Sequence, residues 1–214
     1  MKSMKWTSVA LALVSLVVLA TASTARAQDS GLSSRTEVSV LGGIQALNKN
    51  DTAFPDRFIN VPAAVAVTYH LSRILAVEGE FTWLIPVSQS VTLGSGASQD
   101  MKTPNILAYQ ANVRASWPLS NSAVTPYVAA GAGAITFLSN TEADRLPALN
   151  ESQTAFAINF GTGVSYGVAS NWAVRADFRE FAAFPSTDAV GLSSGGVADP
   201  IWMARGTLGL AYRF

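Results

Sequence analysis

The sequence contains no cysteine, a single histidine and few charged residues, and each shortage excludes a class of protein. Without cysteine there is neither a disulfide framework nor an N-terminal cysteine for lipid attachment, so the fold depends on packing alone. Charged residues make up 13% of the chain and the formal net charge is zero. This composition argues against a nucleic-acid partner, because binding phosphates requires a basic surface. Without cysteine or clustered histidine, we expect no metal site and no cofactor.

Residues 1–27 have the organisation of a secretory signal peptide. Two lysines precede the apolar run VALALVSLVVLA, and Ala25 and Ala27 form a small-x-small cleavage site. The alternative, a membrane anchor, is less favoured because the run is shorter than the roughly 20 residues that a spanning helix needs. The sequence therefore predicts cleavage near Ala27 and a mature domain of residues 28–214.

The mature chain lacks any apolar run of about 18 residues, which excludes helical membrane spans. Its charged fraction is about half the roughly 25% typical of soluble proteins, so much of its surface is expected to face something other than water. A closed β-barrel is the other structure that satisfies its backbone in lipid. Eight segments alternate between apolar and polar residues, as strands do. The expected strands are residues 36–45, 61–71, 74–84, 106–117, 125–137, 155–167, 171–181 and 201–214.

The connections between these segments alternate in length. The long, polar connections are residues 47–60, 85–104, 139–152 and 184–199, and the short ones are residues 72–73, 118–124 and 168–171. This alternation is typical of up-and-down antiparallel barrels with an even number of strands. The sequence therefore predicts an all-β fold, an eight-stranded antiparallel up-and-down transmembrane β-barrel.

Aromatic residues distinguish a lipid-facing barrel from a soluble, lipocalin-like one. They recur on the apolar parity at both ends of the strands, as two girdles around an aliphatic belt, which is typical of a surface that meets lipid. The alternative, a soluble barrel, has no reason to place bulky aromatic residues at both mouths. The residues assigned to the girdles are Tyr69, Trp83, Trp117, Tyr166, Trp172 and Trp202, with Tyr109, Tyr127, Phe137, Phe156 and Tyr212 as further members. The facing of segment 125–137 is ambiguous because it is rich in alanine and glycine.

The opposite face of the strands carries charged residues near mid-strand. An arginine at the midplane of a barrel's lipid face costs about 2 to 4 kcal/mol, so these side chains must point into the lumen. There they are expected to form arginine–carboxylate pairs, for which Glu78 with Arg114 and Asp177 with Arg205 are plausible on register grounds. The predicted lumen charge network is Glu78, Glu80, Arg114, Arg175, Asp177, Arg179 and Arg205.

The chain ends on LGLAYRF, in which Leu208, Leu210, Tyr212 and Phe214 share one face. This ending resembles the C-terminal signature of bacterial outer-membrane barrels, which the barrel assembly machinery reads. The mature chain resembles the small OmpA/OmpX-like outer-membrane β-barrel family, without the peptidoglycan-binding domain that follows the barrel in OmpA. The resemblance implies a monomer in the bacterial outer membrane that contacts outer-membrane lipids, and periplasmic chaperones and the assembly machinery during biogenesis.

Three functions remain open. An eight-stranded barrel is just wide enough to be filled by side chains, so we expect a plugged lumen and a structural or surface-interaction role through the loops. A narrow ion or small-solute channel is the alternative. The third, a lipid A-modifying enzyme, rests on His70 and Ser72 with the two glutamates Glu78 and Glu80, which superficially resemble the His/Ser/Glu set of outer-membrane lipid A deacylases. His70 lies beside a short, periplasmic turn whereas lipid A lies in the outer leaflet, so we expect no catalytic residue.

Overall fold

The computed structural model describes residues 35–48, 57–92, 98–120, 122–142, 144, 149–185 and 200–214. The expected signal peptide and its cleavage site lie outside the described residues, as do parts of the connections, so the leader stays a prediction. None of the described residues belongs to a helix long and apolar enough to cross a membrane.

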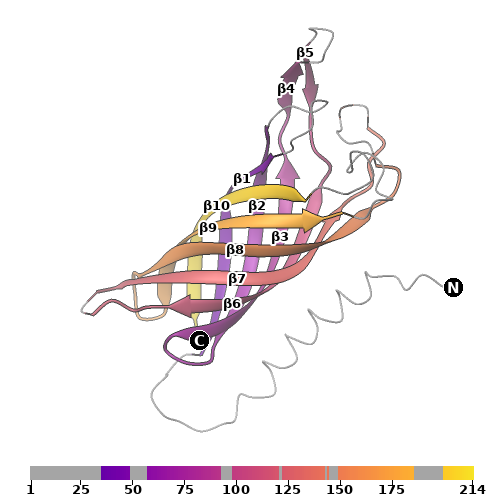
Figure 1. The fold of residues 1–214 in the computed structure, drawn as a ribbon. Helices are drawn as coiled ribbons and strands as arrows, with labels where there is room; N and C mark the ends of the chain where they lie inside the picture. Colours follow the sequence, from indigo (N-terminus) through magenta and orange to yellow (C-terminus); the bar gives the residue numbers. More distant parts are fainter. Residues whose placement is uncertain are drawn as a thin grey trace, which may run out of the picture.

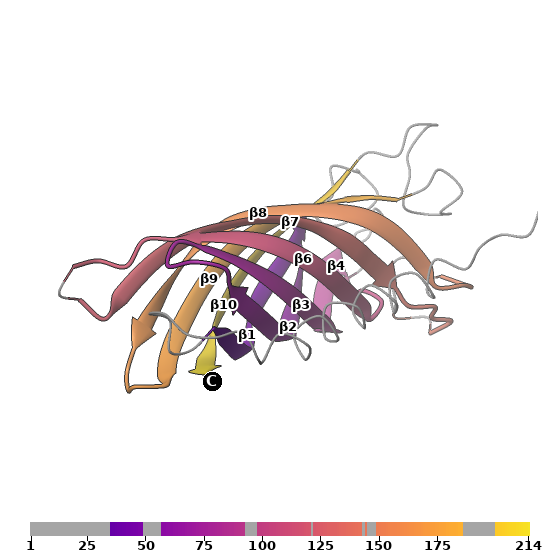
Figure 2. The same ribbon diagram turned by 90° about the horizontal axis from the view of Figure 1, so that it is seen from below.

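Eight of the ten strands formed by the described residues close into an antiparallel barrel, which confirms the predicted fold (Figure 1). Each strand pairs with its neighbours in chain order, and the last strand pairs with the first. The strands run obliquely around the barrel (Figure 2). The barrel strands are β1 (Thr36–Asn48), β2 (Arg57–His70), β3 (Leu75–Pro86), β6 (Ile106–Ser116), β7 (Val124–Phe137), β8 (Gln153–Gly167), β9 (Trp172–Phe184) and β10 (Ile201–Arg213).

Two short strands, β4 (Gln89–Thr92) and β5 (Ser98–Met101), form a hairpin that extends beyond the barrel at the end opposite the C terminus (Figure 1). The sequence predicted no strands between residues 85 and 104, and that prediction is wrong here because each of these strands has only four residues, too few for alternation to be recognised. The side chain of Gln89 fixes the base of the hairpin to β2. Its amide nitrogen donates to the Ile59 carbonyl and its amide oxygen accepts from the Ile59 N–H, both at 3.0 Å.

The ladder between β1 and β2 is interrupted at Pro62. Pairing runs continuously from Thr36 to Gly42 on β1 and resumes only at Gln45, which pairs with Asn60. Proline has no N–H to donate, so it removes a bond from any ladder it enters. The strand itself begins at residue 57 instead of the expected 61.

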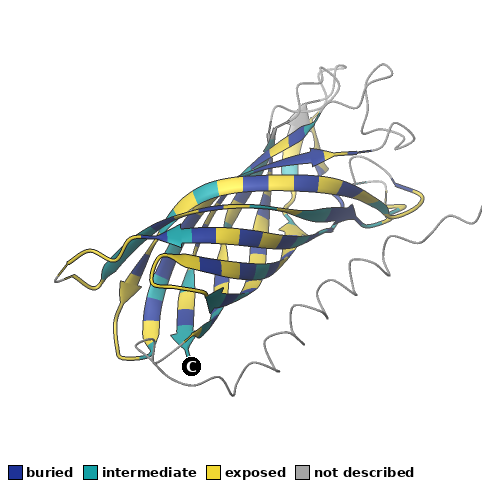
Figure 3. Ribbon diagram, turned by 60° about the horizontal axis from the view of Figure 1, so that its bottom comes forward, coloured by how far each residue is buried: buried dark blue, intermediate teal, exposed yellow. Residues whose placement is uncertain are grey.

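Exposed and buried residues alternate along the barrel strands (Figure 3). On β1, for example, Val40 and Ile44 are each 61% exposed whereas Glu37 and Ser39 are fully buried. Apolar side chains therefore form the outer surface and polar side chains fill much of the interior, which is the reverse of a soluble barrel.

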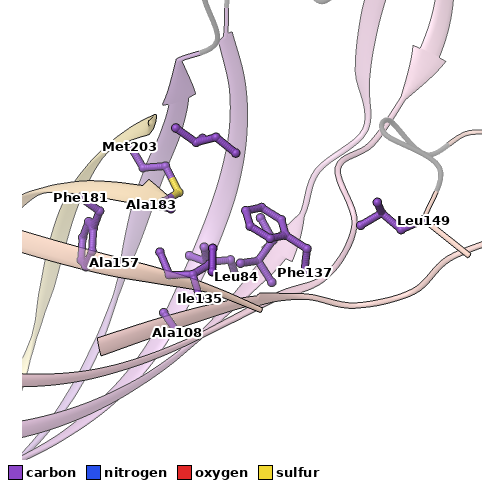
Figure 4. Close-up of a cluster of buried hydrophobic side chains, with 12 residues drawn as sticks. Leu84, Ala108, Ile135, Phe137, Leu149, Ala157, Phe181, Ala183 and Met203 are labelled. Atoms are coloured by element: carbon purple, nitrogen blue, oxygen red, sulfur yellow. The ribbon is translucent and has the colours of Figure 1, made fainter. Parts of the chain in front are cut away.

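The loop-side half of the interior contains a cluster of buried apolar side chains (Figure 4), beside buried polar residues such as Gln45 and Asn60. Leu149, from the connection between β7 and β8, joins this cluster from outside the strands. Contributors from the strands include Leu84, Ile106, Ile135, Phe137, Phe181, Ile201 and Met203.

The interior position of several β7 residues corrects the girdle prediction. Tyr127 and Phe137 were expected on the lipid face, yet they are 1% and 2% exposed inside the barrel. Gly131 explains the facing, because a Cβ at this inward position would overlap with the side-chain oxygen of Asn112. Once Gly131 faces inward, Tyr127 and Phe137 on the same parity must follow.

Candidate functional site: the charged lumen

The lumen holds eight charged side chains between its turn-side mouth and the middle of the barrel, each at most 5% exposed. Seven of them are those singled out from the sequence, and the structure brings all seven into one network. The eighth is Glu37, which makes the buried set four carboxylates and four arginines. The network comprises Glu37 from β1, Glu78 and Glu80 from β3, Arg114 from β6, Arg175, Asp177 and Arg179 from β9, and Arg205 from β10.

Glu78 is the centre of this network. Its two carboxylate oxygens accept hydrogen bonds from Arg175 Nη1 and Arg179 Nη2, both at 2.6 Å. Arg114 Nη1 lies 3.7 Å from the same carboxylate, so the pair expected on register grounds is present but is the longest of the three. Asn112 and Thr68 donate to the remaining acceptor positions at 3.2 Å each. The carboxylate is thus surrounded by donors, as a buried charge requires.

Tyr127 joins two charged residues of β9. Its hydroxyl donates to Asp177 Oδ2 at 2.7 Å and accepts from Arg175 Nε at 2.8 Å. Arg114 and Arg175 also lie over its ring, with 4.7 and 5.2 Å from each guanidinium carbon to the ring centroid. Asp177 is completed by Arg179 Nε at 2.8 Å. Sequence reasoning missed this role because it assigned Tyr127 to the lipid face.

Arg205 pairs with Glu80, and the expected pair with Asp177 is not what the structure shows. Arg205 Nη2 donates to Glu80 Oε1 at 2.7 Å, and Nη1 donates to Thr82 at 2.8 Å. The reason is geometric: Arg205 lies opposite Arg179 in the β9–β10 ladder, and its long side chain reaches across the lumen to β3. Its guanidinium carbon lies 4.8 Å from the centroid of Phe181, where the charged network meets the apolar cluster.

Glu37 closes the network at the turn-side mouth. It accepts from Arg114 Nη1 at 3.3 Å and from Arg213 Nε at 2.8 Å. The alternation in the sequence places it on the inward face, and its position at the start of a strand kept it out of the predicted mid-strand set. Because Arg213 is 36% exposed, this pair is the one that meets water.

His70 and Ser72 do not form the arrangement that an esterase needs. His70 Nε2 lies 3.9 Å from Glu37 Oε2, half-buried at the turn-side mouth. Ser72 Oγ accepts hydrogen bonds from the backbone N–H groups of Ile74 and Leu75, at 3.2 and 3.0 Å. The hydroxyl therefore stabilises the turn between β2 and β3. Within the described part of the chain, no group of histidine, aspartate and glutamate side chains is arranged to hold a metal ion.

The six aromatic residues named first for the girdles lie on the outer surface, unlike Tyr127 and Phe137. Tyr69 is partly exposed, and the other five of the six named first are between 43% and 51% exposed. These five are Trp83, Trp117, Tyr166, Trp172 and Trp202.

The C-terminal residues continue this outer surface. Leu208, Leu210 and Phe214 are exposed, and the Tyr212 ring lies between those of Trp172 and Phe214, with centroids 4.9 Å from each. The Phe214 N–H donates to the carbonyl of Thr36 at 2.9 Å, which fixes the last residue to the first strand.

Comparison with known proteins agrees with this geometry. The N-terminal β-barrel domain of OprF from Pseudomonas aeruginosa is similar in structure, with a TM-score of 0.53 and 14% identity over 85% of this chain and 98% of that domain. Neisserial surface protein A has a TM-score of 0.56 and 15% identity over 84% of this chain and 97% of its own. No curated protein matches in sequence. The model of the outer membrane protein beta-barrel domain matches residues 12–214. The chain therefore belongs to the family of outer membrane protein β-barrel domains.

Proposed function

We propose that this protein is a closed, non-conducting barrel that holds its loop-side structures at the bacterial surface for interaction with other molecules. The observation that carries the proposal is the filled lumen, in which four arginines and four carboxylates are each at most 5% exposed. An eight-stranded barrel has room for side chains and little else.

The network supports a rigid wall because its contacts join strands that are not neighbours. Arg114 on β6 reaches Glu37 on β1. Two further arginines reach β3: Arg175 on β9 contacts Glu78, and Arg205 on β10 contacts Glu80. Each such contact fixes the distance across the lumen, and satisfied buried networks are stiff. A cluster of buried apolar side chains occupies the loop-side half of the same lumen.

The loop side offers the surface on which interaction would take place. The β4–β5 hairpin extends beyond the barrel wall there, and Lys102, just after it, pairs with Asp144 at 3.1 Å. Rigid scaffolds usually carry their function on such connections. In outer-membrane barrels the longer loops face the cell exterior.

A narrow ion path is the second candidate, and one contact favours it. Arg179 Nη1 and Glu80 Oε2 lie 3.6 Å apart, and neither has a hydrogen-bond partner among the described residues. Because these two buried charged atoms make no hydrogen bond, a water molecule or an ion could bind between them. Catalysis has no comparable support, since Ser72 is occupied by backbone donors.

Conductance in a planar bilayer separates the two candidates. The refolded mature barrel is expected to give no steps, with insertion verified by resistance of the barrel to protease. Reproducible steps that change in Arg205→Ala, and do not change in Arg213→Ala at the mouth, would overturn the plugged-lumen proposal. Such a result would make the lumen the functional site.

The surface assignment is tested by single cysteines, because the chain contains none. Gln99→Cys on the β4–β5 hairpin is expected to react with a membrane-impermeant maleimide on intact cells. The matched variant Ala123→Cys lies in an exposed turn at the other end of the barrel and is expected to react only after lysis. The opposite pattern would reverse the orientation and remove the basis for a surface role.

A further inference from the structure

The outer surface of the barrel carries one charged side chain between the aromatic girdles, as far as the structure describes the outward positions. This residue is Glu180 on β9, which follows the inward Arg179 and therefore points outward. Its neighbours in the ladder are Phe160 on β8 and Ala204 on β10. None of the described cations forms an ion pair with it. Sequence reasoning missed Glu180 because it concentrated on the inward charges.

Glu180 lies at a depth where lipid surrounds the wall. On the same face of β9, Trp172 marks the turn-side girdle and Phe184 the loop-side end. A strand rises about 3.3 Å per residue and is tilted by about 45°, so Glu180 lies roughly 9 Å inside the level of Phe184. A carboxylate at this depth is unfavourable in hydrocarbon unless it meets a partner.

Beside Glu180 the outer surface is hollowed. The hollow has a volume of about 780 Å³ and extends over β1, β8, β9 and β10 towards the middle of the membrane. Ala204, the direct cross-strand neighbour of Glu180, is part of its lining. A Cβ at Gly206 would have no atom within 4 Å, so the bottom of the hollow is free of other side chains and is accessible from the outer surface of the barrel. The hollow is shallow and open to the surroundings, so a ligand in it would be covered by the barrel wall on one side.

The charge at the edge of the hollow selects its occupant. A second copy of this barrel offers no complement at this depth, because the outward positions between the girdles whose side chains the structure describes carry no cation. The loop side corresponds to the outer leaflet, where a lipid places its headgroup outward and its chain towards the midplane. Glu180 likewise lies nearer the loop side, and the apolar hollow extends from it towards the midplane.

We propose that this hollow binds a single amphiphile, whose chain lies over Gly206 and Ala204 and whose amine-bearing headgroup pairs with Glu180. The ammonium supplies the charge partner that the wall lacks, and a charge-assisted hydrogen bond is strengthened where water is scarce. The apolar lining recognises the chain without regard to its chemistry, so Glu180 alone sets the preference for an amine.

Spin-labelled probes test this preference directly. The barrel is refolded into phosphatidylcholine vesicles that contain a trace of a long-chain alkylamine, or of the fatty acid with a nitroxide on the same carbon. Electron paramagnetic resonance then gives the fraction of each probe whose motion is restricted by the protein. The wild type is expected to associate with the amine more strongly than with the acid, by about fivefold, the upper range for a partly exposed ion pair.

Three variants separate charge from shape. Glu180→Gln keeps the side-chain size and is expected to abolish the difference between the two probes. Gly206→Leu fills the hollow without strain and is expected to lower the restricted fraction of both probes. Ala111→Leu makes the same kind of change on the outward face of β6, on the far wall of the barrel, and is expected to change neither.

A competition experiment keeps the test valid if Glu180→Gln does not fold. Unlabelled alkylamine should displace the labelled amine from the wild type, whereas an alkyl sulfate of the same length should not. Equal restriction of both probes, or an amine preference that survives in folded Glu180→Gln, would show annular lipid only and overturn the proposal. Retention of the fatty acid that depends on calcium and is reversed by chelation would also overturn it, in favour of a metal-bridged anionic headgroup.

Discussion

Tyr127 on β7 donates a 2.7 Å hydrogen bond to Asp177 on β9, although β8 lies between the two strands. The residue of β8 in register with both is Gly163. A Cβ at Gly163 would overlap with the hydroxyl and ring of Tyr127. The absence of a side chain at Gly163 is therefore what allows the tyrosine to cross a whole strand and join the charged network.

Gly163→Ala is expected to destabilise the barrel by about 1 to 3 kcal/mol, because overpacking forces the neighbouring side chain or strand to move. The free energy of unfolding would be measured by urea titration in detergent micelles. Gly206→Ala is the matched control, since a Cβ there meets nothing within 4 Å. Equal midpoints for the two variants would contradict this account of Gly163.

Tyr127→Phe is expected to lower the free energy of unfolding by about 1 to 3 kcal/mol. Loss of the hydroxyl leaves Arg175 Nε without its acceptor and removes a donor from Asp177, both inside the lumen. The same urea titration reports the change. Tyr166→Phe serves as the control because the Tyr166 ring is half-exposed on the outer surface, and an equal loss there would show that the network is not responsible.

Glu78→Gln is expected to cost about 3 to 5 kcal/mol, because it removes the carboxylate that Arg175 and Arg179 share and leaves the four buried arginines with three buried carboxylates. The amide keeps the size of the side chain, so the loss reports charge more than packing. Glu151→Gln, on an exposed part of the connection before β8, should change the stability by less than about 0.5 kcal/mol. If Glu78→Gln is as stable as the wild type, the network does not hold the barrel together.

Phe214→Ala is expected to reduce the amount of folded barrel in the outer membrane of cells several-fold, while refolding in micelles stays close to that of the wild type. The side chain of Phe214 is 64% exposed and its backbone N–H, which the substitution keeps, makes the bond to Thr36. The difference would be measured by the electrophoretic mobility of unheated membrane fractions. Leu119→Ala, an exposed apolar residue at the turn side, is the control. Equal losses in cells and in micelles would assign Phe214 to stability and not to assembly.

The facing of most strands could be predicted from the sequence because the two sides of the wall meet opposite surroundings. On β3, for example, Glu78 and Glu80 point inward whereas Phe81 and Trp83 point outward. In β7 this contrast disappears, because alanine and glycine fit either side. The direction in which the β7 side chains point depends on the space that Gly131 leaves for Asn112 on the neighbouring strand β6. This is a property of packing and cannot be read from composition.

The partners inside the lumen could not be predicted for a related reason. Register reports which residues are neighbours in the wall, but an arginine side chain is long enough to cross the lumen. Arg205 thus meets Glu80 although β1 and β2 lie between their strands. Which charges face inward is a local property of alternation, whereas their pairing depends on the closed shape of the barrel.

The interruption at Pro62 sets the line along which the wall should part first under mechanical load. The seam between β1 and β10 is continuous, with pairs from Glu37–Arg213 to Asn48–Trp202, so the first and last barrel strands are joined by an unbroken ladder. The missing pairs lie instead beside Gly43 and Ile44, within the first hairpin. Local opening begins where fewest bonds must be lost. When the barrel is pulled mechanically, or in the first local opening on heating, β1 and β2 should therefore separate beside Pro62 while β1 and β10 stay paired.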